Sequence, residues 1–404
     1  MTALQTPAHS SYDIIIIGGA MMGSSTAWFL MNTPDFDGRV LVVERDPTYS
    51  ACSTVHTNSC MRQQFSETLN VRISQFAADF VNNIRDYMGG DDRVPNLSVQ
   101  NYGYMYLADN DDFAQTLREN QKVQLAAGAG TKLMTADELK QAFPFYNVDD
   151  VVLASHNTVN EGYFDGNTVF DWFRRQAREK GVEYIGNEVV AMTLNAAGTA
   201  VESVTLKSGD VVAAGQVVNA SGPRATVTSR MAGIELPVEP RKRFTWIFTA
   251  ETPLDRELPL TIDPSGLHVR QDGKTSYLAG GHADYDPAVD YDDFDMDHGL
   301  WEDHIWPALA TRIPHFEAIK RTNEWAGHYA YNVFDHNAIM GAHEKVQNFV
   351  FLNGFSGHGL QQSPAMGRGT AEMLVYGEYR SLDMSPYDHS RITRGEKFVE
   401  KAVI

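Results

Sequence analysis

A glycine-rich turn near the N-terminus carries the first residues that could bind a cofactor. Residues 14–17 are four isoleucines, an apolar run suited to a buried parallel strand, and Gly18, Gly19, Ala20 and Gly23 follow at once. Such small residues permit a tight turn and let the backbone approach a pyrophosphate, while the N-terminus of a following helix offers free N–H groups to it. The pattern predicts a nucleotide-binding βαβ unit.

An acidic residue at the end of the next predicted strand supports this interpretation. Residues 39–43 are strand-like and lead to Glu44, where a carboxylate can accept hydrogen bonds from a ribose 2′-hydroxyl. The middle glycine of the usual GxGxxG pattern is replaced by Ala20. The alternative is a glycine-rich turn in an ordinary α/β domain, but the strand before the turn and the acid after it favour nucleotide binding.

Composition limits the class of protein. The 404 residues suggest two domains, and a formal net charge of −19 argues against a nucleic-acid or anionic-membrane surface. Cys52 and Cys60 are the only cysteines, so we expect no disulfide framework and a reducing compartment. Residues 1–11 lack an apolar signal-peptide core, and no apolar run of about 18 residues is present. We therefore expect a soluble, cytoplasmic protein.

Away from the first turn, the chain alternates between helical and strand-like patterns. Helices are expected to open at Ser66 and to cover 111–126, 135–143, 168–180 and 363–376. Strands are expected at 101–108, 151–164, 182–184, 188–194, 200–206, 216–224, 244–248, 266–270, 276–278 and 349–352. The run of strands after 237 suggests a second, sheet-based domain.

An acidic stretch at residues 284–303 contains eight aspartates. Aspartates can chelate a hard cation, but the ordered DxDxDG loop with a terminal glutamate is missing. We interpret the stretch as a solvated acidic turn and predict no metal site.

Four motifs, in order along the chain, resemble one family. They are GGAMMG with Glu44, STVHTNSCMRQQF, VVNASGP and NGFSGHGLQQSPAMGRGTAEML. Together they resemble the D-amino acid oxidase superfamily of FAD-dependent oxidoreductases, nearest the sarcosine oxidase and FAD-dependent oxidoreductase-domain branch. The resemblance implies an α/β fold, α+β overall. It consists of a Rossmann-like FAD-binding domain of the glutathione-reductase type (1–90, 150–235 and 325–404) and a mixed-sheet substrate domain (91–149 and 236–324).

The resemblance also implies which residues hold FAD. For the nucleotide half these are Gly18, Gly19, Ala20, Met21, Met22, Gly23, Glu44, Arg45, Val189, Ala220 and Gly222. For the flavin half they are Ser53, Thr54, Cys60, Met61, Gly354, Ser356, Gly357, His358, Gly359, Leu360 and Gln361. Backbone donors in the last segment would stabilise negative charge on the reduced flavin. Sarcosine oxidases link flavin to a cysteine in the segment that here contains His328 and Tyr329, so we expect non-covalent FAD.

For the substrate, Arg62 falls where sarcosine oxidases place the arginine that binds the carboxylate. A bidentate guanidinium would fix the amine carbon over flavin N5. The alternative is a surface arginine that pairs with Glu67.

Three further residues and Gln361 complete the candidate catalytic set. His282 stands at the family's active-site histidine position, and His268 stands near an active-site tyrosine position. Arg270 follows on the same strand face and would suit a dicarboxylate. The histidines could accept the amine proton, but all three could instead be structural strand residues.

The implied activity is oxidation of a secondary or N-substituted amino acid, such as sarcosine or iminodiacetate. Hydride transfer to flavin N5 would give an imine that water hydrolyses, with electrons passing to O2 and release of H2O2. Two lysines that assist oxygen in sarcosine oxidases are absent, because residues 276–278 and Gln361 are neutral. An amine dehydrogenase with another electron carrier therefore stays open.

Other classes also stay open. An FAD-dependent 2-hydroxy acid or glycerophosphate oxidoreductase would share the FAD domain, and a non-catalytic FAD-binding assembly factor would hold flavin without turnover. A plain NAD-dependent enzyme would leave GFSGHG without a purpose. The expected partners are a small amino-carboxylate and O2 or an electron carrier, and the oligomeric state is left open.

Overall fold

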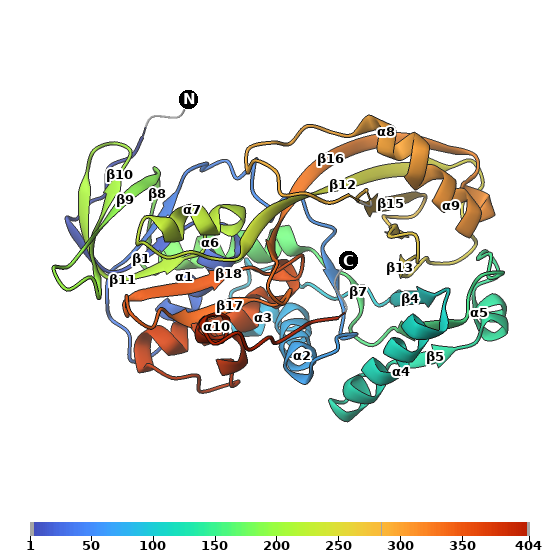
Figure 1. Ribbon diagram of the computed structural model, residues 1–404, viewed down its shortest axis with the longest axis horizontal. Coiled ribbons are helices and arrows are strands. Elements are labelled where there is room, and N and C mark those ends of the chain that lie inside the picture. The colour runs from blue at the N-terminus through green and yellow to red at the C-terminus, as the bar shows by residue number, and fades with distance from the viewer. Residues whose placement is uncertain (1–3, 284, 402–404) are drawn as a thin grey trace. The chain divides into compact units, whose positions relative to one another are not determined.

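The computed structural model describes residues 4–283 and 285–401 and divides into two compact units (Figure 1). Unit 1 consists of Met1–Thr57, Gly166–Pro240 and His328–Val403, and unit 2 of Asn58–Asp165 and Arg241–Gly327. Asp284, the first residue of the acidic stretch, lies outside the described residues.

These boundaries differ from the predicted ones at residues 58–90 and 150–165, which fall in unit 2. A short antiparallel pair joins the two segments, with β3 (Cys60–Met61) bonded to β7 (Gly162–Tyr163). In addition, α2 (Thr68–Asn82) contacts α4 (Asp111–Ala126). These contacts place both segments with the second unit.

Unit 1 is built on an eight-stranded sheet with the central order β17-β18-β11-β1-β2-β8. The strands are β1 (Ser11–Ile17), β2 (Val40–Glu44), β8 (Glu183–Gly186), β11 (Val211–Asn219), β17 (Ile339–Ala342) and β18 (Phe349–Asn353). All these pairs are parallel except β17 with β18. Ile15, Leu41 and Val217 are fully buried, as expected for apolar strands covered on both faces.

A hairpin and three long helices complete unit 1. β9 (Val189–Leu194) and β10 (Val201–Leu206) extend β11 in antiparallel fashion at one end of the unit (Figure 1). The helix α1 (Met21–Met31) packs against both α6 (Gly166–Glu179) and α10 (Gly359–Tyr376). The shorter elements are α7 (Ala225–Arg230), α11 (Ser390–Thr393) and the 3-10 turns Gly222–Arg224 and Ser385–Tyr387.

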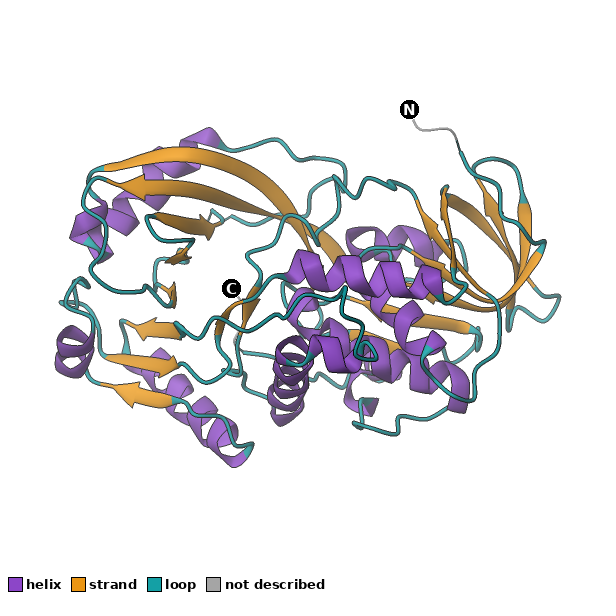
Figure 2. Ribbon diagram, turned by 180° about the vertical axis from the view of Figure 1, so that it is seen from behind, coloured by secondary structure: helices purple, strands orange, loops and turns teal. Residues whose placement is uncertain are grey.

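Unit 2 is built on a second eight-stranded sheet, in the order β16-β12-β15-β14-β13-β4-β6-β5. Its strands are β4 (Tyr104–Ala108), β5 (Lys132–Met134), β6 (Leu153–Asn157), β12 (Val238–Ala250), β13 (Leu260–Ile262), β14 (His268–Gln271), β15 (Ser276–Gly281) and β16 (Ile319–Asn332). The sheet is mixed, because β13 pairs with β4 in parallel and with β14 antiparallel. The long strands β12 and β16 lie side by side (Figure 2).

An aromatic core supports this second sheet. Trp246, Phe248 and Tyr277 on its strands pack with Trp301 and Phe316. The remaining helices are α3 (Ile84–Tyr87), α5 (Ala136–Ala142), α8 (His298–Leu300), α9 (Trp306–Arg312), the π-helical turn Trp301–Ile305 and the 3-10 turn Pro314–Phe316. The predicted fold class, an α/β protein with a mixed-sheet second domain, is confirmed.

Two further observations bear on the sequence-based expectations. Across residues 4–283 and 285–401, no helix has the length and apolar character needed to cross a membrane. In the acidic stretch, Lys242 Nζ donates to Asp293 at 2.7 Å, and Asp290 Oδ1 accepts from the amide of Asp292 at 2.8 Å. No group of three or more potential metal ligands gathers within the described part of the chain.

Candidate active site

The predicted nucleotide turn is closed tightly around two glycines. Gly18 has a φ of +99°, and a Cβ atom there would lie 2.5 Å from the carbonyl oxygen of Ala220. A Cβ atom at Gly23 would lie 1.9 Å from the carbonyl oxygen of Gly18. The amide of Ala220 donates to Ile17 at 2.9 Å, which fixes β11 against the turn. Neither glycine can therefore carry a side chain without backbone movement.

Glu44 lies directly against this turn. One carboxylate oxygen accepts from the amide of Gly19 at 2.8 Å, and the other accepts from the amide of Asp46 at 2.8 Å. Burial raises the pKa of Glu44, while the two backbone donors and the neighbouring Arg45 lower it. The acid predicted from its spacing thus comes together with the glycine turn.

The loop after β2 covers the first residues of α1. Thr54 Oγ1 accepts from the amide of Met21 at 3.3 Å, and Ser53 Oγ donates to the carbonyl of His328 at 2.7 Å. The N-cap residue of α1, Ala20, supplies no side-chain acceptor. This helix end therefore presents backbone N–H groups and a positive dipole that an anion can use.

The end of β11 forms a third part of this surface. Asn219 Nδ2 donates to the carbonyl of Ala225 and to Ser229 Oγ, each at 2.9 Å, and its Oδ1 accepts from Ser221 Oγ at 2.7 Å. These bonds hold the turn that contains Gly222, whose φ is +57°. A Cβ atom at Gly222 would meet nothing within 4 Å, so this backbone faces open space.

The C-terminal glycine turn is shaped by three residues with left-handed backbone. Gly354, Ser356 and Gly357 have φ values of +68°, +48° and +93°. A Cβ atom at Gly357 would lie 2.5 Å from the ring of Tyr329, so the turn depends on glycine there. His358 is the N-cap residue of α10, and its side chain makes no capping hydrogen bond.

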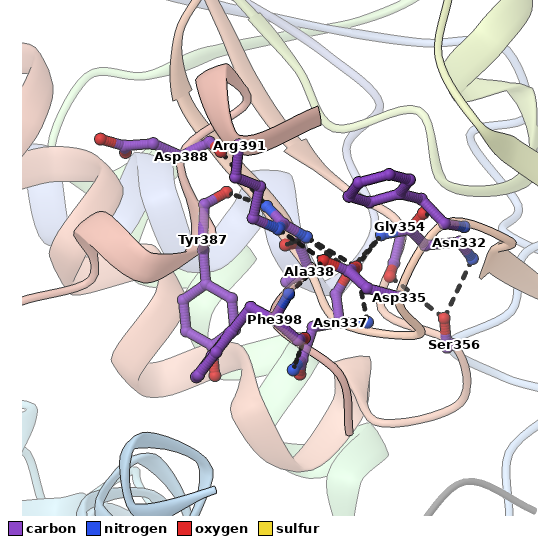
Figure 3. A network of polar contacts seen from close by, with 11 residues as sticks. Asn332, Asp335, Asn337, Ala338, Gly354, Ser356, Tyr387, Asp388, Arg391 and Phe398 are labelled. Atoms are coloured by element: carbon purple, nitrogen blue, oxygen red, sulfur yellow. Dashed lines mark hydrogen bonds and ion pairs between the residues drawn. The ribbon is translucent and has the colours of Figure 1, made fainter. Parts of the chain in front are cut away.

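A buried ion pair is linked to this turn through Asn332 (Figure 3). Arg391 Nε and Nη2 donate to the two oxygens of Asp335 at 2.7 and 2.9 Å. Asp335 also accepts from Asn332 Nδ2 at 2.8 Å, and the amide of Asn332 donates to Ser356 Oγ at 3.0 Å. The C-terminal segment is thereby linked to the turn that contains Gly354 and Ser356.

The other predicted cofactor residues of unit 1 lie on the same elements. A Cβ atom at Gly359 would lie 3.4 Å from Met22 Cε, which brings the starts of α1 and α10 together. The side chain of Leu360 occupies the space beside Gly166, where a Cβ atom would lie 2.6 Å from Leu360 Cδ2. Val189 begins β9 and is buried, and Gln361 is buried in the first turn of α10.

In unit 2, one asparagine joins several of the predicted substrate residues. Asn58 Nδ2 contacts His268 Nε2, and the carbonyl of Asn58 accepts from Arg270 Nε at 3.2 Å and from Cys60 Sγ at 3.2 Å. His268 and Arg270 share one face of β14, as the spacing predicts. Asn58 had no sequence signal beyond its place in the polar loop, because its role depends on tertiary contacts.

His268 is uncharged at neutral pH. Burial, together with the nearby charges of Arg270 and Arg243, lowers the pKa of its imidazole to about 3. Its Nδ1 has no hydrogen-bond partner among the described residues. An imidazole with so low a pKa is a weak base, so His268 is unsuited to accept the amine proton.

Arg270 is 3% exposed and lies at the wall of a cavity of about 670 Å³ within unit 2. Its Nη1 donates to Asp272 at 2.9 Å, and its guanidinium lies 4.8 Å from the ring centroid of Tyr163. The cavity is also lined by polar side chains that include Gln100, Tyr102, Arg256 and Lys274. A buried guanidinium thus faces a space large enough for a small polar molecule.

Arg62 is 2% exposed and is therefore not a surface arginine. Its Nη1 donates to the carbonyl of Gln64 at 2.8 Å and to the hydroxyl of Tyr106. Its guanidinium lies 4.2 Å from the ring centroid of Phe65 and 5.5 Å from that of Tyr104. Neutral oxygens and aromatic faces thus orient the positive charge.

His282 and Met61 are the two remaining predicted residues of unit 2. His282 follows β15, and its Nδ1 lies 2.8 Å from the carbonyl of Ala283. Met61 is fully buried in β3 beside Cys60. Burial raises the pKa of Cys60 to about 11, so its thiol is protonated at neutral pH.

The two units thus show a nucleotide-binding α/β domain of the flavoprotein type and a mixed-sheet domain with buried arginines. Residues 13–373 match the family model described as DAO, FAD dependent oxidoreductase. The chain belongs to this family, and its cofactor is FAD.

Comparisons with individual proteins agree with this membership. FAD-dependent oxidoreductase domain-containing protein 1 from Xenopus laevis is 36% identical, over 97% of this chain and 85% of that protein. Mitochondrial sarcosine dehydrogenase from Mus musculus is 23% identical, over 95% of this chain and 42% of that protein. The crystal structure of L-proline dehydrogenase from P. horikoshii has a TM-score of 0.82 and 26% identity, covering 96% of this chain and 99% of that one.

The residues of unit 1 fit FAD. At Gly18 and Gly23 any side chain would fill the space beside the turn, and at Gly222 the backbone faces open space. Glu44 and the start of α1 lie at the same turn, which gives a ribose acceptor next to anion-binding N–H groups. The donor set therefore suits the dinucleotide half of this cofactor.

Proposed function

We propose that the protein oxidises a secondary or N-substituted amino acid whose carboxylate is bound by Arg62. The observation that carries this proposal is the position of Arg62 and Arg270, the two most deeply buried guanidinium groups among the described residues of unit 2, at 2% and 3% exposed. Burying an arginine is costly unless its charge is used, and a bidentate fork matches a carboxylate. FAD, when bound, supplies the two-electron redox chemistry.

The names of two relatives support the amine class. Sarcosine and proline are both secondary amino acids, and they are the substrates named for the sarcosine dehydrogenase and the L-proline dehydrogenase. Arg270 lies beside the 670 Å³ cavity, where it would offer a guanidinium to a second carboxylate, as in iminodiacetate. The protein's own residues then bind and orient the substrate, and His268 offers a hydrogen-bonding imidazole without taking up charge.

Oxygen, reduced to H2O2, is the electron acceptor that the likeness to sarcosine oxidases favours. A second candidate is a dehydrogenase that passes electrons to another carrier, and one observation favours it. Tyr277 is buried in the aromatic core, where its hydroxyl accepts from the amide of Leu254 at 2.8 Å, and Gln361 is neutral and buried. At these two positions the protein supplies no positive charge for developing superoxide.

The experiment is anaerobic addition of N-methylglycine, iminodiacetate and L-proline to the FAD-loaded protein. Loss of the flavin absorbance band with any of them supports amine oxidation, and its fast return in air with peroxide identifies an oxidase. Slow return identifies a dehydrogenase. No loss with the whole panel, but loss with a 2-hydroxy acid or glycerophosphate, would replace the amine assignment. No loss with any compound would favour a non-catalytic FAD-binding protein.

A further inference from the structure

Glu161 is a completely buried carboxylate that no sequence motif indicates. Its exposed fraction is 0%, and its oxygens accept three hydrogen bonds from neutral donors. Oε1 accepts from the amide of Gln63 at 2.6 Å and from Asn157 Nδ2 at 2.8 Å, and Oε2 accepts from Gln64 Nε2 at 2.9 Å. Burying a carboxylate costs free energy, so its presence here calls for a structural or functional role.

The partners of Glu161 are the two residues that follow Arg62. The side chain of Gln64 is fixed further by the carbonyl of Tyr104, which accepts from Nε2 at 2.8 Å. The carbonyl of Gln64 in turn accepts from Arg62 Nη1 at 2.8 Å. Glu161 therefore sets the loop that aims Arg62, and its charge interacts with that of Arg62.

We propose that Glu161 is a proton-linked positioning residue for Arg62 and takes up a proton when a substrate carboxylate binds that arginine. The proposal rests on the proposed role of Arg62. One buried guanidinium would then face two carboxylates, and a second negative charge nearby favours the neutral form of the first. Glu161 is the acid that can become neutral, because the substrate carboxylate is needed by Arg62.

The charges around Glu161 agree with this role. Burial raises its pKa, its three hydrogen bonds and Arg62 lower it, and the net pKa is about 7. On β6, the titratable residue beside Asn157 in sequence is His156, and burial lowers its pKa to about 4. From β4, the carbonyl of Tyr104 accepts from Gln64 Nε2, and the hydroxyl of Tyr106 accepts from Arg62 Nη1. Arg62 is thus the charge that Glu161 meets.

The protonation of Glu161 determines how the affinity for a carboxylate ligand changes with pH. Below about pH 7 Glu161 is protonated and no longer offers a negative charge to Arg62, so a carboxylate ligand binds most tightly. Above that pH the ionised Glu161 competes with the ligand, and affinity falls by up to about tenfold per pH unit. The effect is on the dissociation constant and KM, with kcat unchanged.

The test is calorimetric binding of methoxyacetate to the FAD-loaded protein. This molecule resembles N-methylglycine but has an ether oxygen in place of the amine, so it cannot be oxidised to an imine. Measurements near pH 8, about one unit above the pKa of Glu161, are made in phosphate and in Tris, whose protonation enthalpies differ, and give the number of protons taken up. We expect uptake approaching one proton in the natural protein, none in Glu161→Gln, and unchanged uptake in the exposed control Glu202→Gln.

The outcomes separate this proposal from the one it rests on. Binding of methoxyacetate to the natural protein without proton uptake, or equal uptake in Glu161→Gln, overturns the role of Glu161 alone. The first of these results needs no variant and holds even if Glu161→Gln does not fold. Failure of methoxyacetate to bind, or equal binding by Arg62→Gln, overturns the carboxylate site of the proposed function.

Discussion

The cofactor turns of unit 1 present mainly backbone atoms, whereas the proposed substrate residues of unit 2 present buried side chains. In unit 1 the surface is mainly backbone, shaped where Gly18, Gly23 and Gly357 leave no room for a Cβ atom. In unit 2 it consists of side chains. The distant residue Tyr106 holds Arg62, and the distant residue Asn58 holds His268 and Arg270. At these three glycines the backbone site tolerates no added atom, whereas the side-chain site depends on its charge and its hydrogen-bond donors. Five substitutions can test this contrast.

The largest effect is expected from Gly23→Ala. The added methyl would lie 1.9 Å from the carbonyl oxygen of Gly18, so strand and helix must separate. We expect loss of FAD and a decrease of about 3 kcal/mol or more in the free energy of unfolding. The flavin-to-protein absorbance ratio and thermal unfolding measure both. Gly299→Ala, whose methyl would lie 3.4 Å from Asp297, is the control, and FAD retention by Gly23→Ala would contradict the backbone site.

A similar loss of stability is expected from Asp335→Asn. The change leaves Arg391 as an uncompensated buried charge, which costs about 3–5 kcal/mol. Denaturant unfolding measures this loss. The exposed pair of Arg394 and Glu396 provides the control, since Arg394→Gln should cost at most about 1 kcal/mol. Equal effects of the two variants would show that the network in Figure 3 does not support the turn.

Arg62→Gln is expected to weaken catalysis while leaving the cofactor in place. The variant keeps a polar side chain but loses the charge, so kcat/KM for N-methylglycine should fall about 100-fold through KM. Its FAD content should match that of the natural protein. Arg72→Gln, an exposed change on α2, should have no effect. A fall in FAD content alone would instead place Arg62 with the cofactor.

The smallest effect is expected from Cys52→Ser and Cys60→Ser. Burial raises the pKa of each thiol to about 11, so neither supplies the thiolate that covalent attachment needs. Acid precipitation should release all flavin from the natural protein and from both variants. Flavin that stays with the natural protein's pellet, but not with one variant's, would identify a covalent link.

Sequence patterns were most informative where structure is local. The glycine turn with Glu44 and the hairpin at 189–206 follow from adjacent residues, and both are found close to their predicted bounds. Helix α10 was expected to begin at Ser363 because Ser-Pro suits a helix start, yet it begins at Gly359 and runs through Pro364. Ser363 Oγ donates to the carbonyl of Leu360 at 2.9 Å, the group that proline leaves without its N–H partner.

The residues of the proposed substrate site were harder to predict from the sequence, because many of their contacts involve residues distant in the chain. Asn58 and Glu161 are isolated polar residues with no periodic or motif signal, and each acquires its role from contacts across unit 2. The resemblance supplied Arg62 and His268 by position, but not their burial or the neutral state of the imidazole. Such properties depend on packing that single-residue patterns do not encode.

The strand order of unit 1 has a consequence for synthesis on the ribosome. Ile17 on β1 pairs with Asn219 on β11, which pairs on its other side with Phe351 on β18. In contrast, β14 and β15 of unit 2 pair across a short turn, with His268 opposite Gly280. Pairings this distant are slow to form, and β11 keeps an open apolar edge until β18 has emerged. The nascent chain therefore exposes that edge while the residues between Asn219 and Phe349 are made, a period in which chaperone binding would prevent aggregation.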